Sequence, residues 1–300
     1  MDAFSILFRL ISDHTVKLEL CYKINGSSMS YLETGTGRVY FEDHPRIKGT
    51  TEQGTLLLVH GWGMSVRCWD PILPALVGGG YRVVSIDHRG CGLSDKDFDD
   101  MSISAIAGDV VALVEHLALE KVVLNGWSLG GAVVVEAASL LGESCVALVL
   151  TGGATPLYTQ KDDFEFGGTD EDVAGTLQAY ENDRLNFLQG LSTIICVKDV
   201  GAHIEDWMYR IFLEASPRAG ATLAGLAQLD QREMLMALDM PIISLFGSED
   251  GFVAPPICRW VGEHHPRAQL AEFPGVGHAP FIEERKGYLA ALFKFLGEAQ

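Results

Sequence analysis

Residues 121–131 read KVVLNGWSLGG and carry the most informative pattern in the chain. The first half is an apolar, β-branched run, which is typical of a short buried strand. The run breaks at residues 126–130, a G-x-S-x-G match, and a helix-forming run follows directly from Gly131 to Leu141. Strand, match and helix in this order predict a nucleophile elbow, the turn that lifts a serine hydroxyl, here that of Ser128, above the edge of a sheet.

Crowding explains the two glycines of this match. The chain reverses sharply from strand to helix, so a Cβ at Gly126 or Gly130 would collide with neighbouring backbone. The turn also leaves the backbone N–H of Leu129 free at the start of the helix, aimed at the place where a negative oxygen can form. We therefore predict Ser128 as a nucleophile and Leu129 as one donor of an oxyanion hole.

The composition favours one large α/β unit with an insertion. The chain has 300 residues, of which 48% are hydrophobic, and this supplies a sizeable core. A net charge of −18 repels phosphate groups, so we expect no nucleic-acid partner. No run approaches the roughly 18 apolar residues of a membrane span, so we expect no such span.

Cysteines and acidic runs bear on location and cofactors. The six cysteines are scattered without a C-x-x-C pair, which favours reduced thiols and a cytoplasmic location. The acidic runs at 95–100 and 162–165 lack the alternation of acids with a glycine that marks a calcium loop. We expect no metal and no other cofactor, and the expected partner is a small-molecule ester substrate.

Apolar runs alternate with amphipathic runs on both sides of the elbow. Besides the elbow strand, strands are predicted at residues 29–33, 38–41, 55–60, 81–87, 146–150, 241–246 and 269–273. Helices are predicted at residues 69–77, 104–117, 131–141, 257–263 and 284–296. This alternation is typical of βαβ units, so we predict an α/β fold with a mostly parallel, eight-stranded sheet flanked by helices. In such sheets the chemistry lies beyond the carboxyl ends of the strands.

The alternation stops between residues 155 and 235. This region contains no convincing buried strand and carries amphipathic patterns at 173–182, 184–189, 203–215 and 218–229. We predict a helical cap inserted over the strand ends. The predicted organisation is therefore an N-terminal extension (1–28), an α/β core in two parts (29–154 and 236–300) and a cap (155–235).

Two residues downstream of Ser128 stand where its catalytic partners belong. A serine hydroxyl needs a base to take its proton, and the base needs an acid that fixes its tautomer. After a serine elbow, the acid and then the histidine follow along the chain. Asp250 follows the strand predicted at 241–246, and His278 follows the strand predicted at 269–273. We predict Asp250 and His278 as these partners, with Glu249 as the alternative acid.

The loop after the strand at 55–60 is predicted to supply the second oxyanion donor. It reads HGWG at residues 60–63, and its glycines let the backbone turn inward, so the N–H of Trp62 is the candidate. We expect Gly61 and the indoles of Trp62 and Trp127 to line the substrate pocket. Ordinary core packing is the alternative for the two indoles.

The remaining histidines are not assigned to catalysis. His60 and His88 lie on loops at strand ends, where we expect them to form supporting hydrogen bonds, because neither follows the serine in the chain. His264 and His265 precede Pro266 among charged neighbours, and we expect both to be solvated.

Taken together, five motifs resemble those of the α/β-hydrolase superfamily over residues 29–298. They are HGWG (60–63), DHRGCGLS (87–94), GWSLGG (126–131), Asp250 and HAPF (278–281). Within the superfamily, the chain looks most like the carboxylesterases that act on pimeloyl-carrier-protein methyl ester, and like the cofactor-free haloperoxidase and esterase group. The resemblance implies an α/β-hydrolase fold, a triad of Ser128, Asp250 and His278, and Trp62 and Leu129 as oxyanion donors.

The predicted activity is that of a carboxylic ester hydrolase, which forms an acyl-enzyme on Ser128 from a small hydrophobic ester, lactone or thioester. The same triad leaves open a cofactor-free haloperoxidase or perhydrolase, an acyltransferase and a carbon–carbon bond hydrolase. Against the last, Trp127 and Ala279 stand where that group usually carries Asn and Trp. A receptor that binds a small ligand under the cap is the hypothesis from a different class of protein.

Overall fold

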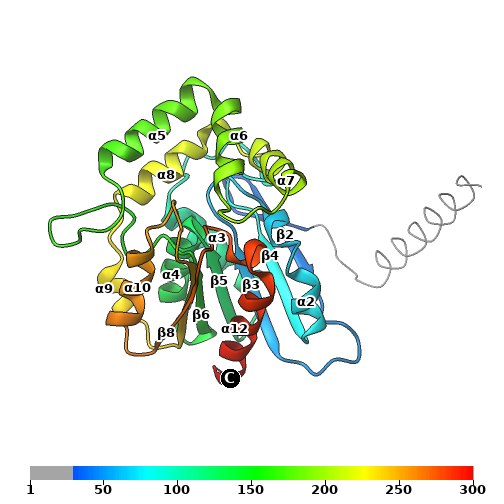
Figure 1. The fold of residues 1–300 in the computed structure, drawn as a ribbon. Helices are drawn as coiled ribbons and strands as arrows, with labels where there is room; N and C mark the ends of the chain where they lie inside the picture. Colours follow the sequence, from blue (N-terminus) through cyan, green and yellow to red (C-terminus); the bar gives the residue numbers. More distant parts are fainter. Residues whose placement is uncertain (1–29, 300) are drawn as a thin grey trace, which may run out of the picture.

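Eight strands form one sheet in the order β1-β2-β4-β3-β5-β6-β7-β8 (Figure 1). The structure is a computed structural model that describes residues 30–299. β1 pairs antiparallel with β2, and β2 pairs antiparallel with β4, whereas the pairs from β4 to β8 are parallel. The predicted α/β fold with a mostly parallel, eight-stranded sheet is therefore confirmed. The extension predicted at 1–28 lies outside the described residues.

The central strands are apolar because both of their faces are covered. All six residues of β7 are buried, and a parallel strand buried on both faces is expected to be apolar throughout. The strands are Ser30–Glu33 (β1), Arg38–His44 (β2), Gly54–Val59 (β3), Tyr81–Ile86 (β4), Val122–Trp127 (β5), Cys145–Thr151 (β6), Ile242–Gly247 (β7) and Ala268–Phe273 (β8).

Helices pack on the two faces of the sheet and form two hydrophobic clusters (Figure 1). One cluster contains α3 (Ile103–His116), α4 (Leu129–Leu141) and α10 (Pro255–His264). The other contains α2 (Leu73–Gly78) and α12 (Arg285–Glu298). The core thus has an apolar layer on each side of the sheet, as a doubly wound α/β domain requires.

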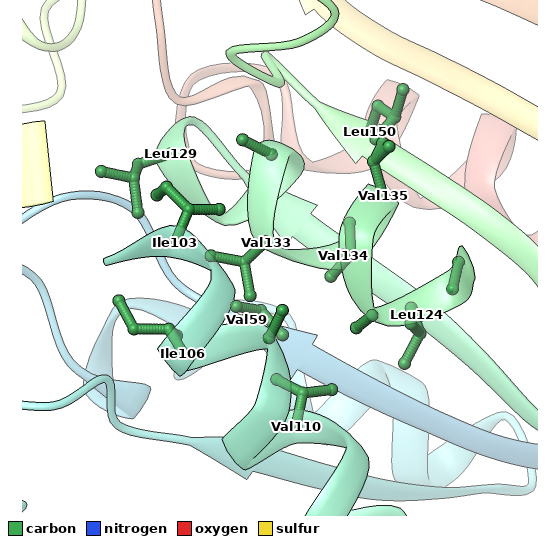
Figure 2. Close-up of a cluster of buried hydrophobic side chains, with 14 of the residues drawn as sticks. Val59, Ile103, Ile106, Val110, Leu124, Leu129, Val133, Val134, Val135 and Leu150 are labelled. Atoms are coloured by element: carbon green, nitrogen blue, oxygen red, sulfur yellow. The ribbon is translucent and has the colours of Figure 1, made fainter. Parts of the chain in front are cut away.

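The packing of α3 on α4 holds the elbow in place. Figure 2 shows Ile103 and Ile106 of α3 on the side that faces Leu129 and Val133 of α4. The side chain of Ser102 caps α3 by accepting a hydrogen bond from the Ala105 N–H at 3.1 Å. Since α4 begins directly at the elbow, its burial between α3 and the sheet fixes the direction of the turn.

A helical insertion separates β6 from β7, as predicted. It contains α5 (Asp170–Asn182), α6 (Arg184–Ile194), α7 (Ala202–Leu213), α8 (Gly220–Ala227) and α9 (Arg232–Ala237). In Figure 1, α5 to α8 lie above the sheet, whereas α9 lies lower, where its Leu235 joins the cluster of α4. We call α5 to α8 with their connections the cap. Its predicted boundaries, 155 and 235, remain a prediction.

Several predicted helices differ from the observed ones in extent. The helix predicted at 69–77 is a 3₁₀ turn (Val66–Trp69, η1) followed by α2, because Pro74 has no N–H and fits only the first turn of a helix. The helix predicted at 218–229 is likewise divided into a 3₁₀ turn at Pro217–Ala219 and α8. α9 was not predicted, since six residues are too few to show a helical period.

Within residues 30–299, no helix combines the length and the apolar character that crossing a membrane requires.

Candidate active site

Ser128 lies between β5 and α4 with a positive φ. Its φ of 56° and ψ of −123° are rare for an L residue, and such a conformation persists only where neighbouring contacts impose it. The Ser128 N–H donates to the Thr151 carbonyl at 3.0 Å. The Ser128 carbonyl accepts from the N–H groups of Gly131 and Ala154, both at 2.8 Å. These three bonds impose the turn.

The space around the elbow admits no side chain at its two outer glycines. A Cβ at Gly126 would lie 2.1 Å from the Gly130 carbonyl oxygen. A Cβ at Gly130 would lie 2.4 Å from the Val59 carbonyl oxygen. Both neighbours are backbone atoms that cannot rotate away, so the predicted glycine requirement is confirmed.

Three predicted site residues follow neighbouring strands of the sheet. Ser128 follows β5, Asp250 follows β7 and His278 follows β8, while Gly152 follows the intervening β6. The carboxyl ends of these parallel strands share one edge of the sheet. A Cβ at Gly152 would lie 3.2 Å from Asp250 Oδ2 and 3.4 Å from His278 Nδ1. Gly152 therefore leaves room for the Asp250–His278 pair.

Asp250 and His278 form a buried hydrogen-bonded pair. The distance between His278 Nδ1 and Asp250 Oδ2 is 2.8 Å. His278 is 3% exposed and Asp250 is 5% exposed. The other carboxylate oxygen of Asp250 accepts from the N–H groups of Phe252 and Val253, at 2.8 and 2.9 Å. An ionised carboxylate only accepts, so Nδ1 carries the proton and Nε2 is left as the acceptor. Glu249, the alternative acid, does not make this contact.

Three further contacts hold the loop that carries His278. The indole N–H of Trp127 donates to the His278 carbonyl at 2.9 Å. The His278 N–H donates to the carbonyl of Ile195, which caps the end of α6, at 3.0 Å. The ring of Phe252 stacks on the imidazole, with 5.0 Å between the centroids. The Ile195 contact could not be predicted from the sequence, because a backbone carbonyl leaves no signal in residue identity.

The backbone of each predicted oxyanion donor lies close to Ser128. Leu129 is the first residue of α4, where N–H groups have no acceptor within the helix. A Cβ at Gly61 would lie 3.1 Å from the Cβ of Ser128, so the backbone that leads into Trp62 passes close to the serine. The indole N–H of Trp62 donates to the Ala219 carbonyl of the cap at 2.7 Å.

Ser128 and His278 line one cavity of about 350 Å³, together with Gly61, Trp62, Trp127 and Leu129. This volume falls within the range of small-molecule sites. Much of the remaining wall comes from cap side chains, among them Phe187, Leu191, Ile194, Ile195, Phe212 and Leu223. The cap could be predicted from the sequence but these residues could not, since only the folded arrangement of the cap helices decides which apolar side chains turn inward.

The cavity is apolar over most of its wall. Among the described residues, no Asp, Glu, Lys or Arg side chain lines it. Thr176 lines it, but its hydroxyl donates to the Asp172 carbonyl at 2.8 Å. The hydroxyl of Tyr158 makes no hydrogen bond to residues 30–299, and burial, with a smaller contribution from the Asp250 charge, raises its pKa. Tyr158 therefore presents a protonated hydroxyl.

His60 and His88 form a second buried pair, behind the loop of Trp62. The Nδ1 of His60 donates to the Gly61 carbonyl at 2.7 Å, and its Nε2 accepts from the His88 N–H at 2.9 Å. The two rings stack with 3.8 Å between centroids. Burial lowers the pKa of His60 to about 4 and the pKa of His88 well below its usual value. Both rings are thus neutral at pH 7. The predicted supporting bonds are confirmed for the His60 ring, whereas His88 contributes only its backbone N–H, and its ring Nε2 is buried without a hydrogen-bond partner among residues 30–299.

Asp87, next to His88, carries a perturbed carboxyl group. It accepts from the N–H groups of Val66 and Leu93, both at 2.7 Å. Burial nevertheless raises the pKa of Asp87 to about 7, against the opposing effect of these two bonds. The carboxyl group thus ties its own loop, which includes Leu93, to the segment of Val66 that follows β3.

One prediction about histidine was wrong. His265 is 2% exposed, and its Nε2 lies 2.9 Å from the Leu238 carbonyl. In the folded chain, this side chain contacts Leu238 at the end of α9. Charged neighbours in the sequence do not reveal that contact. His264 is exposed and stacks on Trp260, as expected of a residue at a helix end. Across residues 30–299, no group of three or more His, Cys, Asp or Glu is placed to hold a metal ion.

Comparison with known proteins gave matches over most of the chain. Residues 56–291 match the alpha/beta hydrolase family. The chain is 30% identical over 243 residues to the pimeloyl-[acyl-carrier protein] methyl ester esterase of Nitrosomonas europaea, covering 78% of this chain and 92% of that protein. It is 26% identical over 243 residues to the AB hydrolase superfamily protein YisY of Bacillus subtilis, covering 80% and 90%.

Solved structures share the architecture. The bromoperoxidase from Bacillus anthracis superposes with a TM-score of 0.84 at 26% identity, covering 91% of this chain and 100% of that one. The esterase from Exiguobacterium antarcticum gives a TM-score of 0.84 at 23% identity, covering 90% and 100%. The second likeness concerns the fold alone.

Proposed function

The chain belongs to the alpha/beta hydrolase family, and from this premise we propose that it is a carboxylic ester hydrolase with Ser128, His278 and Asp250 as its triad. The observation that carries the proposal is the 2.8 Å bond between Asp250 Oδ2 and His278 Nδ1, beside a cavity that Ser128 also lines. Similarity to a protein named as a methyl ester esterase supports ester chemistry.

The proposed reaction proceeds in two halves through an acyl-enzyme. Ser128 Oγ attacks the ester carbonyl carbon while His278 Nε2 takes the hydroxyl proton, and Asp250 stabilises the resulting imidazolium. The backbone N–H groups of Trp62 and Leu129 bind the oxyanion. The C–O bond to the alcohol then breaks, and the alcohol leaves with the proton from His278. Water, activated by the same nitrogen, adds to the acyl-enzyme and releases the acid and the free serine.

The cavity supports a small, uncharged acyl group or lactone as the substrate. Its wall is apolar and carries no Asp, Glu, Lys or Arg side chain in the described part of the chain, so a charged acyl chain would lose its hydration without a partner. The hydroxyl of Tyr158 is a donor that could hold one polar substituent. We propose that Trp62, Trp127 and Gly61 form the part of this pocket nearest to Ser128.

A second candidate activity is the cofactor-free formation of a peracid. Similarity to a bromoperoxidase at 26% identity favours it over acyl transfer and carbon–carbon bond hydrolysis. In this reaction hydrogen peroxide, rather than water, attacks the acyl-enzyme, and the same three residues serve. An acyltransferase would differ only in taking an alcohol or amine as the acceptor, while a carbon–carbon bond hydrolase or a ligand receptor would leave simple esters intact.

Labelling and turnover together test the proposal. A fluorophosphonate probe should attach to Ser128, and p-nitrophenyl esters of increasing chain length should be hydrolysed, with short to medium chains preferred. Products should be analysed with peroxide, alcohols and amines as competing acceptors. Peracid or transfer products in excess of the free acid would favour a perhydrolase or an acyltransferase. A folded protein that neither reacts with the probe nor turns over any ester would overturn the proposal.

The cytoplasmic location also remains a proposal. The five cysteines of the described chain are free, namely Cys68, Cys91, Cys145, Cys196 and Cys258. Burial raises the pKa of the Cys91 and Cys145 thiols to about 12, so both stay protonated and unreactive at neutral pH. These thiols support a reducing compartment.

A further inference from the structure

The carboxylate of Glu283 joins the histidine loop to the cap. Glu283 ends the short helix α11 (Pro280–Glu283), just after His278 in the chain. Its oxygens accept from the N–H of Gly277 at 3.0 Å and from the N–H of Ala279 at 3.3 Å. They also accept from the N–H groups of Val197 and Lys198, which follow α6 in the cap, at 2.8 and 3.0 Å.

These four N–H groups, of which that of Gly277 is shared between both oxygens, use the full acceptor capacity of the side chain. An ionised carboxylate offers about four lone-pair sites, and here four backbone N–H groups fill them. No other residue type of this length could do the same, because a glutamine side chain has one acceptor oxygen and two donor hydrogens that would face N–H groups. The charge also strengthens each bond relative to a neutral acceptor.

The backbone N–H groups around His278 donate in turn to two different acceptors. The N–H groups of Gly277 and Ala279 go to Glu283, and the N–H of His278 between them goes to the Ile195 carbonyl of the cap. Three successive amides of the histidine loop are thus held, and the backbone of His278 has no freedom to rotate without breaking at least one bond.

The contact between the two segments is also tight. A Cβ at Gly277 would lie 2.9 Å from the Val197 nitrogen and 3.1 Å from Glu283 Oε1. On the cap side, Ile194 and Ile195 line the cavity directly before the segment that Glu283 binds. The wall of the acyl pocket and the imidazole therefore belong to one hydrogen-bonded unit.

We propose that Glu283 is a positioning residue, which fixes His278 and the cap segment after α6 relative to each other. The inference rests on the proposed function, since it gives His278 the role of base. Through this link, the position of the pocket wall and the position of the base cannot vary independently. Glu283 touches neither the substrate nor the reacting atoms, and acts only through His278 and residues 195–198.

The matched control for Glu283 is its neighbour Glu284. Glu284 carries the same charge and reaches the same cap segment, but it binds the side-chain ammonium of Lys198 at 2.6 Å instead of backbone amides. Glu284→Gln removes that exposed pair, which contributes little. Glu283→Gln keeps the shape and removes half of the acceptor sites, and Glu283→Ala removes all of them. Gly277→Ala separates the two segments while Glu283 stays intact.

Hydrogen exchange of the full chain, followed by mass spectrometry, tests the link without reference to catalysis. Glu283→Ala should speed exchange in residues 195–198 and in residues 276–279 together, Glu283→Gln should do so to a smaller degree, and Glu284→Gln should leave both segments as in the wild type. If Glu283→Ala does not fold, Glu283→Gln and Gly277→Ala carry the same expectation. Faster exchange in only one segment, or equal effects of the two glutamine variants, would overturn the proposal.

Kinetics then separate positioning from a loss of folded protein. Rates are normalised to the fraction of Ser128 that the fluorophosphonate labels. Glu283→Ala should then lower kcat by about tenfold to a hundredfold, because a displaced base takes the serine proton less efficiently. The change in KM should be smaller. The NMR signal of the His278 Nδ1 proton should weaken in the same variant and persist in Glu284→Gln. Unchanged kcat per labelled site would contradict the role. If the wild type hydrolyses no ester while both segments still exchange together, the proposed function fails and the link stands.

Discussion

Residues 126–131 and residues 187–195 both line the same cavity, but they are constrained in opposite ways. In the elbow, a Cβ at Gly126 or Gly130 would meet backbone atoms within 2.1 to 2.4 Å. In α6, a Cβ at Gly190 would meet nothing within 4 Å, and Leu185 and Ile194 are 58% and 61% exposed. The first region has no space for a side chain at these two glycines, whereas the second has open space at Gly190.

This difference assigns separate roles to the two regions. Chemistry that depends on the placement of a hydroxyl within a few tenths of an ångström is built on backbone that cannot move. In the proposed function, the acyl group is recognised by side chains of the cap, which can change size without disturbing the elbow. Substitutions in the core should therefore change the rate of the reaction, and substitutions in the cap should change which substrate is preferred.

Ser128→Ala should have the largest effect, and it tests whether the core sets the rate while the cap sets binding. It removes the proposed nucleophile, so kcat should fall by about 10⁶-fold. Binding of a non-hydrolysable ester analogue, measured by calorimetry, should remain within a few-fold of the wild type because the cap wall is intact. Residual turnover near the wild-type rate would show that the reaction uses another nucleophile.

Asp250→Asn tests the acid in the same region. The amide can offer its N–H to His278 and hold the wrong tautomer, so kcat at neutral pH should fall by about 10⁴-fold. Initial rates across pH 6 to 9 provide the measurement. Glu249→Gln is the control and should keep nearly full activity, since Asp250 alone bonds to the imidazole. A large loss in the Glu249 variant would instead support Glu249 as the acid.

A pair of glycine substitutions compares the two regions directly. Gly126→Ala forces a Cβ against the Gly130 carbonyl and should lower the free energy of unfolding by about 3 kcal/mol. Gly190→Ala in α6 enters open space and should raise it by about 0.5 to 1 kcal/mol, because alanine favours helix. Urea denaturation measures both. Equal effects would contradict the contrast between a crowded elbow and an open cap.

Phe187→Ala should change specificity rather than rate. The ring of Phe187 lines the cavity and packs against Tyr180, with 5.7 Å between centroids. Its removal should move the preferred p-nitrophenyl ester to a longer chain, with about a tenfold change in the ratio of kcat/KM between long and short esters. Leu185→Ala on the exposed face of α6 is the control. A proportional loss for all chain lengths would mean that the cap also sets the rate.

The smallest effect concerns pH, and it should originate in the core. The buried His60 and His88 have lowered pKa values, so the unfolded chain binds more protons than the folded chain between about pH 4 and 6.5, and stability rises with pH there. Asp87, with a pKa raised to about 7, acts in the opposite sense between about pH 4 and 7. These three groups together contribute a net rise of about 1 kcal/mol per pH unit.

Urea midpoints at pH 4.5, 5.5 and 6.5 measure this slope. Removing an exposed cap pair, as in Arg210→Gln, should leave the slope unchanged because such pairs contribute little. A flat profile for the wild type would contradict the burial of neutral histidines in the core.

The sequence predicted the core better than the cap, for a physical reason. Ser128, Asp250 and His278 each follow a strand, so their common edge could be inferred from strand order and chain direction alone. The structure brings Asp250 and His278 into contact, while their catalytic roles stay a prediction. The glycines of the elbow were predicted because steric exclusion acts between residues that are close in sequence.

Contacts between distant segments could not be predicted in this way. The acceptors that Ile195 and Ala219 supply are backbone carbonyls, which every residue has. His265 looked solvated from its neighbours, but its burial depends on where Leu238 passes in the folded chain. Glu283 and Glu284 are adjacent and chemically identical in the sequence. No local feature indicates that Glu283 binds four backbone amides while Glu284 binds a lysine side chain.

Trp62 spans the boundary between the rigid core and the adaptable cap within one residue. Its backbone belongs to the loop beside Ser128. Its indole N–H donates a hydrogen bond to the carbonyl of Ala219, 157 positions further along the chain. A chimera that carried the lid of another enzyme would have to offer a carbonyl at that point, or leave the indole unpaired at a cost of about 1 to 3 kcal/mol. Exchanging lids between homologues should therefore succeed only when the loop at residues 60–64 travels with them.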